Sequence, residues 1–206
     1  MPPVVHILVL AAGASSRMRG RDKLLLPVKG RPLLRHSVDV ASGTGAPVHV
    51  ALPPDNTARR QVLNGSTAVQ IEVPDADRGM SRSLVQGVGA IAAMASGAED
   101  GIMVLPADMP GFSTKVLADL ISRFRAEPDL IWRGSTVDGQ PGHPIIFPRA
   151  LWAELAGISG DEGGRSVLRR HGDLVRLVPL PGQMALLDLD TPEDWAAYQG
   201  RPLASS

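Results

Sequence analysis

The stretch LVLAAGASSRMRGRDKLLLP, residues 8–27, is the most informative part of this chain. It begins within an apolar run, residues 4–10, that only His6 interrupts, and it continues into the small residues 11–16. Such a run predicts a strand that is buried on both faces of a parallel sheet. A buried strand that leads into a loop of small residues brings backbone N–H groups close to a phosphate. The stretch therefore favours a phosphate-binding loop in an α/β fold.

The second half of this stretch is basic, with four cations within seven residues: Arg17, Arg19, Arg21 and Lys23. Guanidinium and ammonium groups beside free backbone N–H groups suit a polyphosphate. The loop is neither a Walker A loop nor a dinucleotide fingerprint, because it lacks G-x-x-x-x-G-K-[ST] and G-x-G-x-x-G. It therefore predicts nucleotide binding of another kind.

Composition narrows the class of protein further. The chain has 206 residues, enough for one α/β domain with its own core. Aromatic residues make up only 3%, so the core must be built from Leu, Val, Ile and Ala. Basic and acidic residues balance at 21 each, which argues against nucleic-acid binding through bulk charge.

Several other kinds of site and location are excluded or disfavoured. The chain has no cysteine, which rules out disulfides, thiolate metal sites and cysteine nucleophiles. The histidines outside the motifs show no metal-ligand spacing and G-x-S-x-G is absent, so neither zinc nor a serine triad is expected. No apolar run approaches the roughly 20 residues of a membrane span, and the start lacks a signal-peptide layout. We expect a cytoplasmic protein without a membrane partner.

Strand and helix patterns alternate over the first two thirds of the chain. Strands are expected over residues 4–10, 47–52, 68–73, 102–106, 130–132, 145–147, 174–178 and 184–189. Helices are expected over residues 30–41, 57–63, 84–94, 113–124, 149–155 and 166–171. A last helix is expected to start with Thr191 or Asp190 as its cap, and residues 133–144 are expected to be loop.

This alternation predicts a single α/β domain over residues 1–200, with a frayed tail at 201–206. The sheet should be mainly parallel, twisted and Rossmann-like, with helices on both faces. An antiparallel edge or hairpin is expected in the last third, where the pattern is less regular. Ligands of such sheets bind at the carboxyl ends of the strands, near the switch in strand order.

Acidic residues follow two of the expected strands. Asp108 lies between Pro106 and Pro110, and Asp188 and Asp190 follow or end a later strand. Mg²⁺ typically binds one or two carboxylates together with phosphate oxygens and water. Asp190 is the preferred second ligand of the metal. Side chains alternate along a strand, so Asp188 would share a face with Asp190 only if the strand continued through both residues. A turn aspartate and a helix cap are the structural alternatives for Asp108 and Asp190.

The opening stretch resembles the nucleotidyltransferase signature L-A-A-G-x-S-x-R-M-…-K-x-L-L-P. Within that superfamily it is most similar to the MobA/MocA-like enzymes of molybdenum cofactor maturation. The resemblance runs from Leu8 to Trp195 and includes later segments in the family's order: GMSRSL at 79–84, LPADMP at 105–110, GQPGHP at 139–144, GDEGGR at 160–165 and DTPED at 190–194. It implies a fold of the nucleotide-diphospho-sugar transferase type.

The resemblance also implies roles for individual residues. Arg17 and Lys23 match the catalytic cations, for the leaving pyrophosphate and the α-phosphate, and Asp108 and Asp190 match the metal ligands. Nucleotide contacts are implied for Leu10, Ala11, Ala12, Gly13, Lys23, Gly79, Ser81, Ser83 and Asp108. The two serines have an equal claim as helix N-caps. Acceptor contacts are implied for His143, Gly160, Asp161 and Arg165.

The resemblance implies Mg²⁺-dependent transfer of a nucleoside monophosphate, CMP from CTP, to molybdopterin, with release of pyrophosphate. A molybdoenzyme that receives the cofactor is a further expected partner. Three alternatives stay open: GTP with the same cofactor, CTP with a sugar or polyol phosphate, and a maturation chaperone without turnover. The chaperone alternative is favoured by a single feature. The segment before Lys23 has one residue more than the pattern R-M-G-x-x-K, so the loop must bulge.

Overall fold

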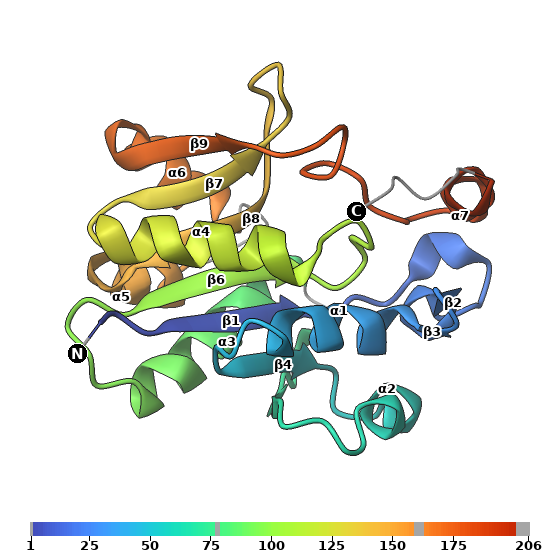
Figure 1. Cartoon of the computed structure of the whole chain (residues 1–206). Coiled ribbons are helices and arrows are strands. Elements are labelled where there is room, and N and C mark those ends of the chain that lie inside the picture. Colours follow the sequence, from blue (N-terminus) through green and yellow to red (C-terminus); the bar gives the residue numbers. More distant parts are fainter. Residues whose placement is uncertain (1, 77–78, 159–162, 201–206) are drawn as a thin grey trace.

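A seven-stranded sheet forms the centre of the computed structural model, which describes residues 2–76, 79–158 and 163–200. The strand order is β5-β4-β1-β6-β8-β7-β9 (Figure 1). The strands are β1 (Val5–Leu10), β4 (Val48–Leu52), β5 (Val69–Glu72), β6 (Gly101–Pro106), β7 (Ile131–Ser135), β8 (Pro141–Pro148) and β9 (Val175–Pro179).

Most neighbouring strands are parallel. The pairs β1–β4, β1–β6, β4–β5 and β7–β9 run in the same direction, whereas β8 runs against both β6 and β7. The expected mainly parallel α/β sheet with an antiparallel part in the last third is confirmed. The antiparallel strand β8 lies inside the sheet, and the edge strand β9 is parallel to its neighbour. Every residue of β4 and β6 is buried, as expected for strands covered on both faces.

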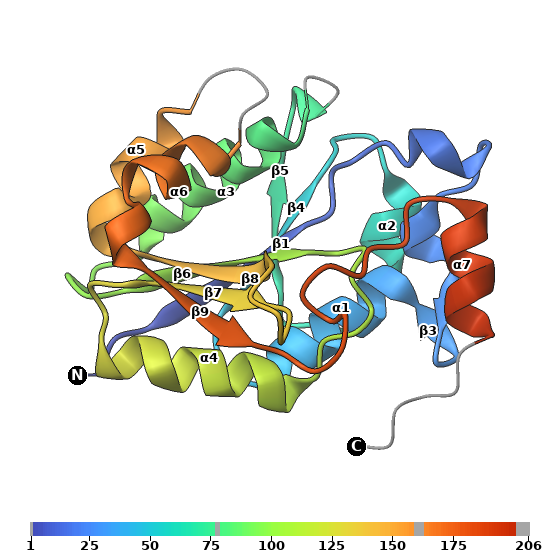
Figure 2. The ribbon, with the colours of Figure 1, turned by 90° about the horizontal axis from the view of Figure 1, so that it is seen from above.

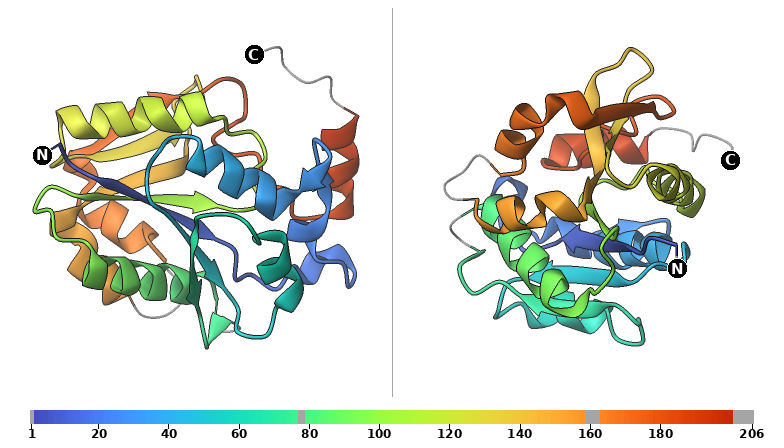
Figure 3. Two further views of the ribbon diagram at one scale, coloured as in Figure 1. Left: turned by 60° about the horizontal axis from the view of Figure 1, so that its bottom comes forward. Right: turned by 90° about the vertical axis from the view of Figure 1, so that its left-hand side faces the viewer.

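Helices cover both faces of the sheet (Figure 2). One face carries α1 (Leu33–Ser42) and α4 (Thr114–Ala126). The other carries α3 (Met80–Met94), α5 (Trp152–Ala156) and α6 (Arg165–Arg170). Figure 3 shows the same layers from two further directions. At the carboxyl end of β1 lie α2 (Thr57–Val62), α7 (Pro192–Gln199) and the small pair β2 (Pro27–Val28) and β3 (Arg31–Pro32) (Figure 1).

Strand alternation divides the core into two clusters. Along β1, Ile7 and Val9 belong to the cluster under α1 and α4, whereas Leu8 belongs to the cluster under α3. Gly87 lets α3 approach the sheet closely, because a Cβ at this position would overlap the side chain of Leu8. The expected strand at residues 4–10 is therefore confirmed as a strand buried on both sides.

The strand order reverses next to β1. The chain passes from β1 to β4 and β5 on one side, and β6 then pairs with β1 on the other side. Backbone hydrogen bonds fix the first residue after each of the strands β1 and β6. Ala11 N–H donates to the Ala51 carbonyl at 3.0 Å, and Ala107 N–H donates to the Leu10 carbonyl at 3.1 Å. This switch point is where open α/β sheets bind ligands.

Three expected boundaries are wrong. Helix α3 begins at Met80, four residues before the expected start. Residues 133–144 are not all loop, because β7 extends to Ser135 and β8 starts at Pro141, which forms a hairpin. No strand forms at residues 184–189, where turns fold the chain. The apolar side chains of that segment, such as Leu189, enter the core without joining the sheet.

Further expectations concern membrane spans, the C-terminal tail and the extent of the domain. Within the described ranges, no helix combines the length and apolar character needed to cross a membrane. The expected tail, residues 201–206, lies outside the described residues. A single domain over residues 1–200 stays a prediction.

The buried His49, which contacts the half-buried His6, predicts acid-sensitive stability. Nδ1 of His6 lies 3.2 Å from Nε2 of His49, and burial, followed by the charge of His6, lowers the pKa of His49 to about 4. A lowered folded-state pKa means that the unfolded chain takes up the proton first. The free energy of unfolding should therefore be highest above pH 6.5 and fall toward pH 4 by about 3 kcal/mol through this group.

Urea denaturation of wild type and His49→Gln between pH 8 and 4.5 measures this contribution. The other titrating groups are common to both proteins, so the wild-type curve should lose stability more steeply below pH 6.5. Parallel curves would show that His49 does not carry this pH dependence.

Candidate active site at the carboxyl ends of β1 and β6

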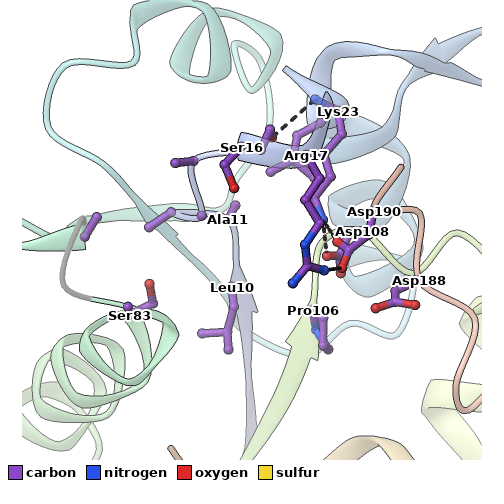
Figure 4. A pocket seen from close by; sticks show the side chains of 17 residues that line it. Leu10, Ala11, Ser16, Arg17, Lys23, Ser83, Pro106, Asp108, Asp188 and Asp190 are labelled. Carbon is purple, nitrogen blue, oxygen red and sulfur yellow. Dashed lines mark hydrogen bonds and ion pairs between the residues drawn. The ribbon is translucent and has the colours of Figure 1, made fainter. Parts of the chain in front are cut away.

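A cavity of about 510 Å³ lies at the switch point (Figure 4). Its walls come from the end of β1 and the following loop, the start of α3, the end of β6 and the segment before α7. The lining residues are 10–17, Lys23, Leu24, Ala76, Gly79, Ser83, Pro106, Asp108, Asp188 and Asp190. The volume is within the usual range for a small-molecule site.

The loop after β1 is shaped by small residues and left-handed turns. Ala11 and Ala12 are buried, whereas a Cβ at Gly13 would meet no atom within 4 Å. Arg19 and Gly20 both have a left-handed backbone, with φ of 51° and 84°. These two residues turn the chain back, so the extra residue before Lys23 does not keep its side chain from the cavity.

Lys23 joins two carboxylates that lie far apart in the sequence. Its Nζ is 2.6 Å from Oδ2 of Asp108 and 2.5 Å from Oδ1 of Asp190 (Figure 4). Burial by itself lowers the pKa of Lys23, but the charges and hydrogen bonds of Asp108 and Asp190 outweigh it and raise the pKa. The ammonium is therefore fully charged, and it holds the two carboxylates on either side of one cation.

Arg17 lies at the mouth of the cavity. Its Nη1 donates to Oδ2 of Asp190 at 2.7 Å, and 72% of its side chain is exposed. Exposed ion pairs are worth at most about 1 kcal/mol, so a more strongly charged ligand would draw this guanidinium away. Arg19 instead pairs with Glu193 at 3.0 Å, and both side chains are exposed.

The segment that carries Asp188 and Asp190 is fixed from both sides. Leu189 is fully buried, and its backbone N–H donates to the Asp108 carbonyl at 3.1 Å. The two aspartates flank this anchor and both line the cavity. The expectation that they end a strand is wrong, because this anchor and the turns before it replace strand pairing.

Asp188 and Asp190 are in different electrostatic environments. Burial raises the pKa of Asp188, and the charges of Asp190 and Asp108 raise it further. Thr191 is the cap of α7, in a capping box with Asp194 and with Pro192 at the first helical position. Asp190 is therefore not the cap, and its carboxylate is free to bind Lys23 and Arg17. Strand alternation made Asp188 the less favoured metal ligand, but its side chain also lines the cavity.

The charges around the cavity suit a divalent cation. Two cations and three carboxylates line it, so with every group ionised the side chains carry one net negative charge. A triphosphate needs the opposite sign, which a divalent ion at Asp108 and Asp190 would supply. Among the described residues no group of three acidic or histidine side chains is arranged to hold a metal. The pair therefore fits an ion that also takes phosphate oxygens and water as ligands.

The two serines of the expected nucleotide segment have different surroundings. Both serines are buried, but only Ser83 lines the cavity, as does Gly79. The hydroxyl of Ser81 has no hydrogen-bond partner among the described residues. Neither serine is an N-cap, because Gly79 precedes the first turn of α3 with a φ of 111°. A glycine with this backbone starts the helix earlier than the serines indicated.

The expected acceptor residues lie away from the cavity lining. His143 is on β8, where its N–H donates to the Ala185 carbonyl at 2.9 Å, and burial, followed by the charge of Arg133, lowers its pKa to about 4. Its imidazole is therefore neutral near pH 7. Arg165 is exposed at the start of α6. Gly160 and Asp161 lie outside the described residues.

Arg133 is a basic residue that sequence analysis missed in this region. Its Nε donates to the Gly142 carbonyl at 3.0 Å, and burial, followed by the charge of Arg165, lowers its pKa. Neither arginine has a carboxylate within ion-pair distance in the described part of the chain. No motif marks Arg133, because it lies in a stretch that the sequence indicated to be loop.

A mostly parallel sheet whose switch point holds small residues, two cations and a carboxylate pair defines an α/β enzyme for phosphate-rich nucleotides. Comparison with known proteins identifies the family. Residues 7–175 match the family described as MobA-like NTP transferase domain, so the chain belongs to that family and is a nucleotidyltransferase. The resemblance in the sequence motifs is thereby confirmed.

Several relatives match nearly the whole chain. Purine catabolism protein PucB from Bacillus subtilis is 30% identical and aligns with 94% of this chain and 95% of its own length. A probable molybdenum cofactor guanylyltransferase from Nostoc sp. is 26% identical, with coverage of 94% and 89%.

Solved structures share the fold of this chain. The crystal structure of Rv0371c from Mycobacterium tuberculosis H37Rv has a TM-score of 0.80 and 26% identity, covering 98% of this chain and all of that one. A complex of Rv0371c with manganese has a TM-score of 0.70 and 28% identity, covering 96% and 98% of the two chains.

The bridging position of Lys23 predicts competition with a metal ion. In Lys23→Met no ammonium is present between Asp108 and Asp190, so Mn²⁺ without nucleotide should bind at least about tenfold more tightly than to wild type, or about 1.4 kcal/mol. Titration of free Mn²⁺ by electron paramagnetic resonance measures this affinity.

The exposed Lys115→Met on α4 serves as the matched control and should bind Mn²⁺ as wild type does. In Lys23→Met, a further Asp108→Asn change should abolish the gain. Equal Mn²⁺ affinity of Lys23→Met and wild type would contradict the competition.

Proposed function

We propose that this nucleotidyltransferase moves a nucleoside monophosphate onto a molybdopterin-type cofactor and releases pyrophosphate. The observation that carries the proposal is the contact of Lys23 with both Asp108 and Asp190 in a cavity at the sheet's switch point. This places a cation and a carboxylate pair where the loop after β1 offers room for a triphosphate. The cofactor class is supported by relatives whose names include molybdenum cofactor guanylyltransferase.

The reaction needs positioned charge more than a covalent nucleophile. An oxygen of the acceptor phosphate attacks the α-phosphorus, a new P–O bond forms, and the bond to the bridging oxygen of pyrophosphate breaks. Both reactants are already anionic, so no base has to remove a proton. Lys23 would stabilise charge on the α-phosphate, and the exposed Arg17 would follow the leaving pyrophosphate.

Mg²⁺ is the metal we assign to Asp108 and Asp190. It would supply positive charge to the phosphoryl oxygens when bound. Both carboxylates reach the same ammonium, so they lie close enough to share one ion. Asp188, with its raised pKa, is a less suitable anionic ligand.

The nucleobase would lie against the backbone of residues 10–13, Gly79 and Ser83, all of which line the cavity. CTP is our first assignment, because the segments GQPGHP and GDEGGR resemble those of the MocA-like branch. GTP is the second candidate, and the names of the guanylyltransferase relatives favour it. In both cases the acceptor is the same.

An anionic acceptor would meet a basic region beside β8. Arg133 and Arg165 influence each other electrostatically, and an acceptor phosphate would offset their repulsion. His143, neutral near pH 7, adds a polar group there. We assign Arg133, Arg165 and His143 to the acceptor side.

A chaperone without turnover has less support. The extra residue before Lys23 favoured it, yet Lys23 contacts both carboxylates. A molybdoenzyme remains the expected recipient of the finished cofactor.

Pyrophosphate release tests the proposal. Wild type with Mg²⁺, a molybdopterin acceptor and CTP, GTP, ATP or UTP in turn should release pyrophosphate with one triphosphate, CTP by our assignment. Asp108→Ala should lower the rate by at least about 100-fold, because it removes a ligand of the metal and a partner of Lys23.

The exposed Asp119→Ala on α4 is the control and should retain wild-type activity. Release with a sugar or polyol phosphate in place of molybdopterin would reassign the acceptor. Cofactor binding without pyrophosphate release from any triphosphate would favour the chaperone and contradict the proposal.

The basic region predicts a separate effect on the acceptor. Arg133→Gln and Arg165→Gln should each raise the acceptor KM by about 10- to 100-fold, since a charge-assisted hydrogen bond contributes about 1.5–3 kcal/mol. The triphosphate KM should not change. Arg176→Gln on the edge strand β9 is the control, and an unchanged acceptor KM in both variants would remove these residues from the acceptor site.

A further inference from the structure

Arg59 is a deeply buried arginine on the short helix α2, outside the cavity lining. Only 2% of its side chain is exposed, and it is among the largest buried side chains of the described residues. Nε and Nη2 donate to the two carboxylate oxygens of Asp22, at 2.7 and 2.9 Å. Nη1 donates to the carbonyl oxygen of Ala11 at 2.6 Å. A single guanidinium thus binds two separate points of the signature stretch.

Those two points are the ends of the loop that lines the cavity. Ala11 follows the last residue of β1, and Asp22 directly precedes Lys23. Arg59 lies 48 and 37 positions away from them in the chain. Within the loop, the Ser15 hydroxyl donates to Oδ1 of Asp22 at 3.4 Å and accepts from the backbone N–H of Lys23 at 3.3 Å. The contacts of Arg59 are shorter, and they tie Asp22 directly to Ala11.

Asp22 transmits this constraint to Lys23. Its Oδ1 accepts from the backbone N–H of Leu24 at 3.0 Å, which caps the short helical turn that begins with Lys23. Its Oδ2 also accepts from the Asn56 side chain at 3.2 Å. Burial raises the pKa of Asp22, but the hydrogen bonds and charge of Arg59 outweigh it and hold the pKa below its usual value. The carboxylate is therefore charged and fixed.

We propose that Arg59 is a positioning residue for the transfer reaction, which sets through Asp22 where the ammonium of Lys23 lies relative to Asp108 and Asp190. This inference rests on the proposed function. A buried ion pair loses hydration on folding, and an apolar residue of similar volume would fill the same space without that loss. The bidentate contact fixes the orientation of the backbone before Lys23, which an apolar residue could not do.

Arg60 provides a matched comparison on the same helix. Its Nη2 pairs with Glu72 at 3.0 Å and lies 3.4 and 3.3 Å from the carbonyls of Pro53 and Pro54. None of these partners belongs to the loop. Arg60 therefore stabilises the same region through an ion pair of similar chemistry, without contact to the signature stretch.

A double-mutant cycle tests whether Arg59 acts through Lys23. Arg59→Lys keeps the charge but loses the two-pronged contact, so kcat for pyrophosphate release should fall about 30-fold with an unchanged acceptor KM. In the Lys23→Met background the same change should alter kcat less than about threefold, because the positioned group is absent. Arg60→Lys should leave kcat unchanged in both backgrounds.

A merely structural role gives a different result. Arg59→Lys would then lower the rate by the same factor in both backgrounds, as a loss of folded protein does, and the proposal would be overturned.

A second measurement does not depend on turnover. The chain has three lysines, Lys23, Lys29 and Lys115, so ¹³C-labelled lysine gives a simple ε-methylene spectrum in which Lys23→Met assigns the signal of Lys23. Lys29 and Lys115 are exposed, whereas Lys23 is held between two carboxylates. In Arg59→Gln the Lys23 signal should move toward the positions of the exposed lysines, while the other two signals stay in place.

Arg60→Gln should leave all three signals unchanged. An unmoved Lys23 signal in folded Arg59→Gln would overturn the positioning role, whatever the activity. If wild type releases no pyrophosphate but the Lys23 signal moves only in Arg59→Gln, the proposed function fails and the link between Arg59 and Lys23 stands.

Discussion

The ammonium of Lys23 lies between the carboxylates of Asp108 and Asp190, and the rest of the site depends on this arrangement. Two carboxylates so close together repel each other unless a cation separates them. Arg17 adds a second, exposed cation on the outer side of Asp190. The two cations thus pair with Asp108 and Asp190, and Asp188 leaves the cavity with one net negative charge. A divalent ion with its triphosphate is the kind of ligand that would replace these ion pairs.

The topology of the sheet explains why these residues meet. Lys23 is separated from Asp108 by 85 positions and from Asp190 by 167. The reversal of strand order at β1 and β6 leaves an opening between their carboxyl ends, and each functional segment leaves the sheet or crosses it at that opening. The backbone bond from Leu189 to the Asp108 carbonyl then fixes the last segment, which has no strand partner of its own.

A second layer of polar contacts lies behind the cavity. The loop after β1 contains small residues that line the cavity, allow close approach of a ligand and contribute little packing of their own. Met18 anchors its middle in the core, and Arg59 with Asp22 ties its ends together. Accessibility to a ligand and rigidity of the loop are thus supplied by different residues, which is a general requirement of a preorganised site.

The sequence alone determined the fold class, the strand before residue 11, and the identity of the main charged groups, because apolar runs and short motifs are local signals. It did not determine that α3 starts at Met80. It also did not determine that residues 184–189 lack a strand, since burial of apolar side chains looks the same in a strand and in an anchored turn. Only the tertiary structure showed Arg59 and Arg133 as polar groups near the site. Their importance comes from partners that lie distant in the chain, and the spacing of neighbouring residues carries no record of such contacts.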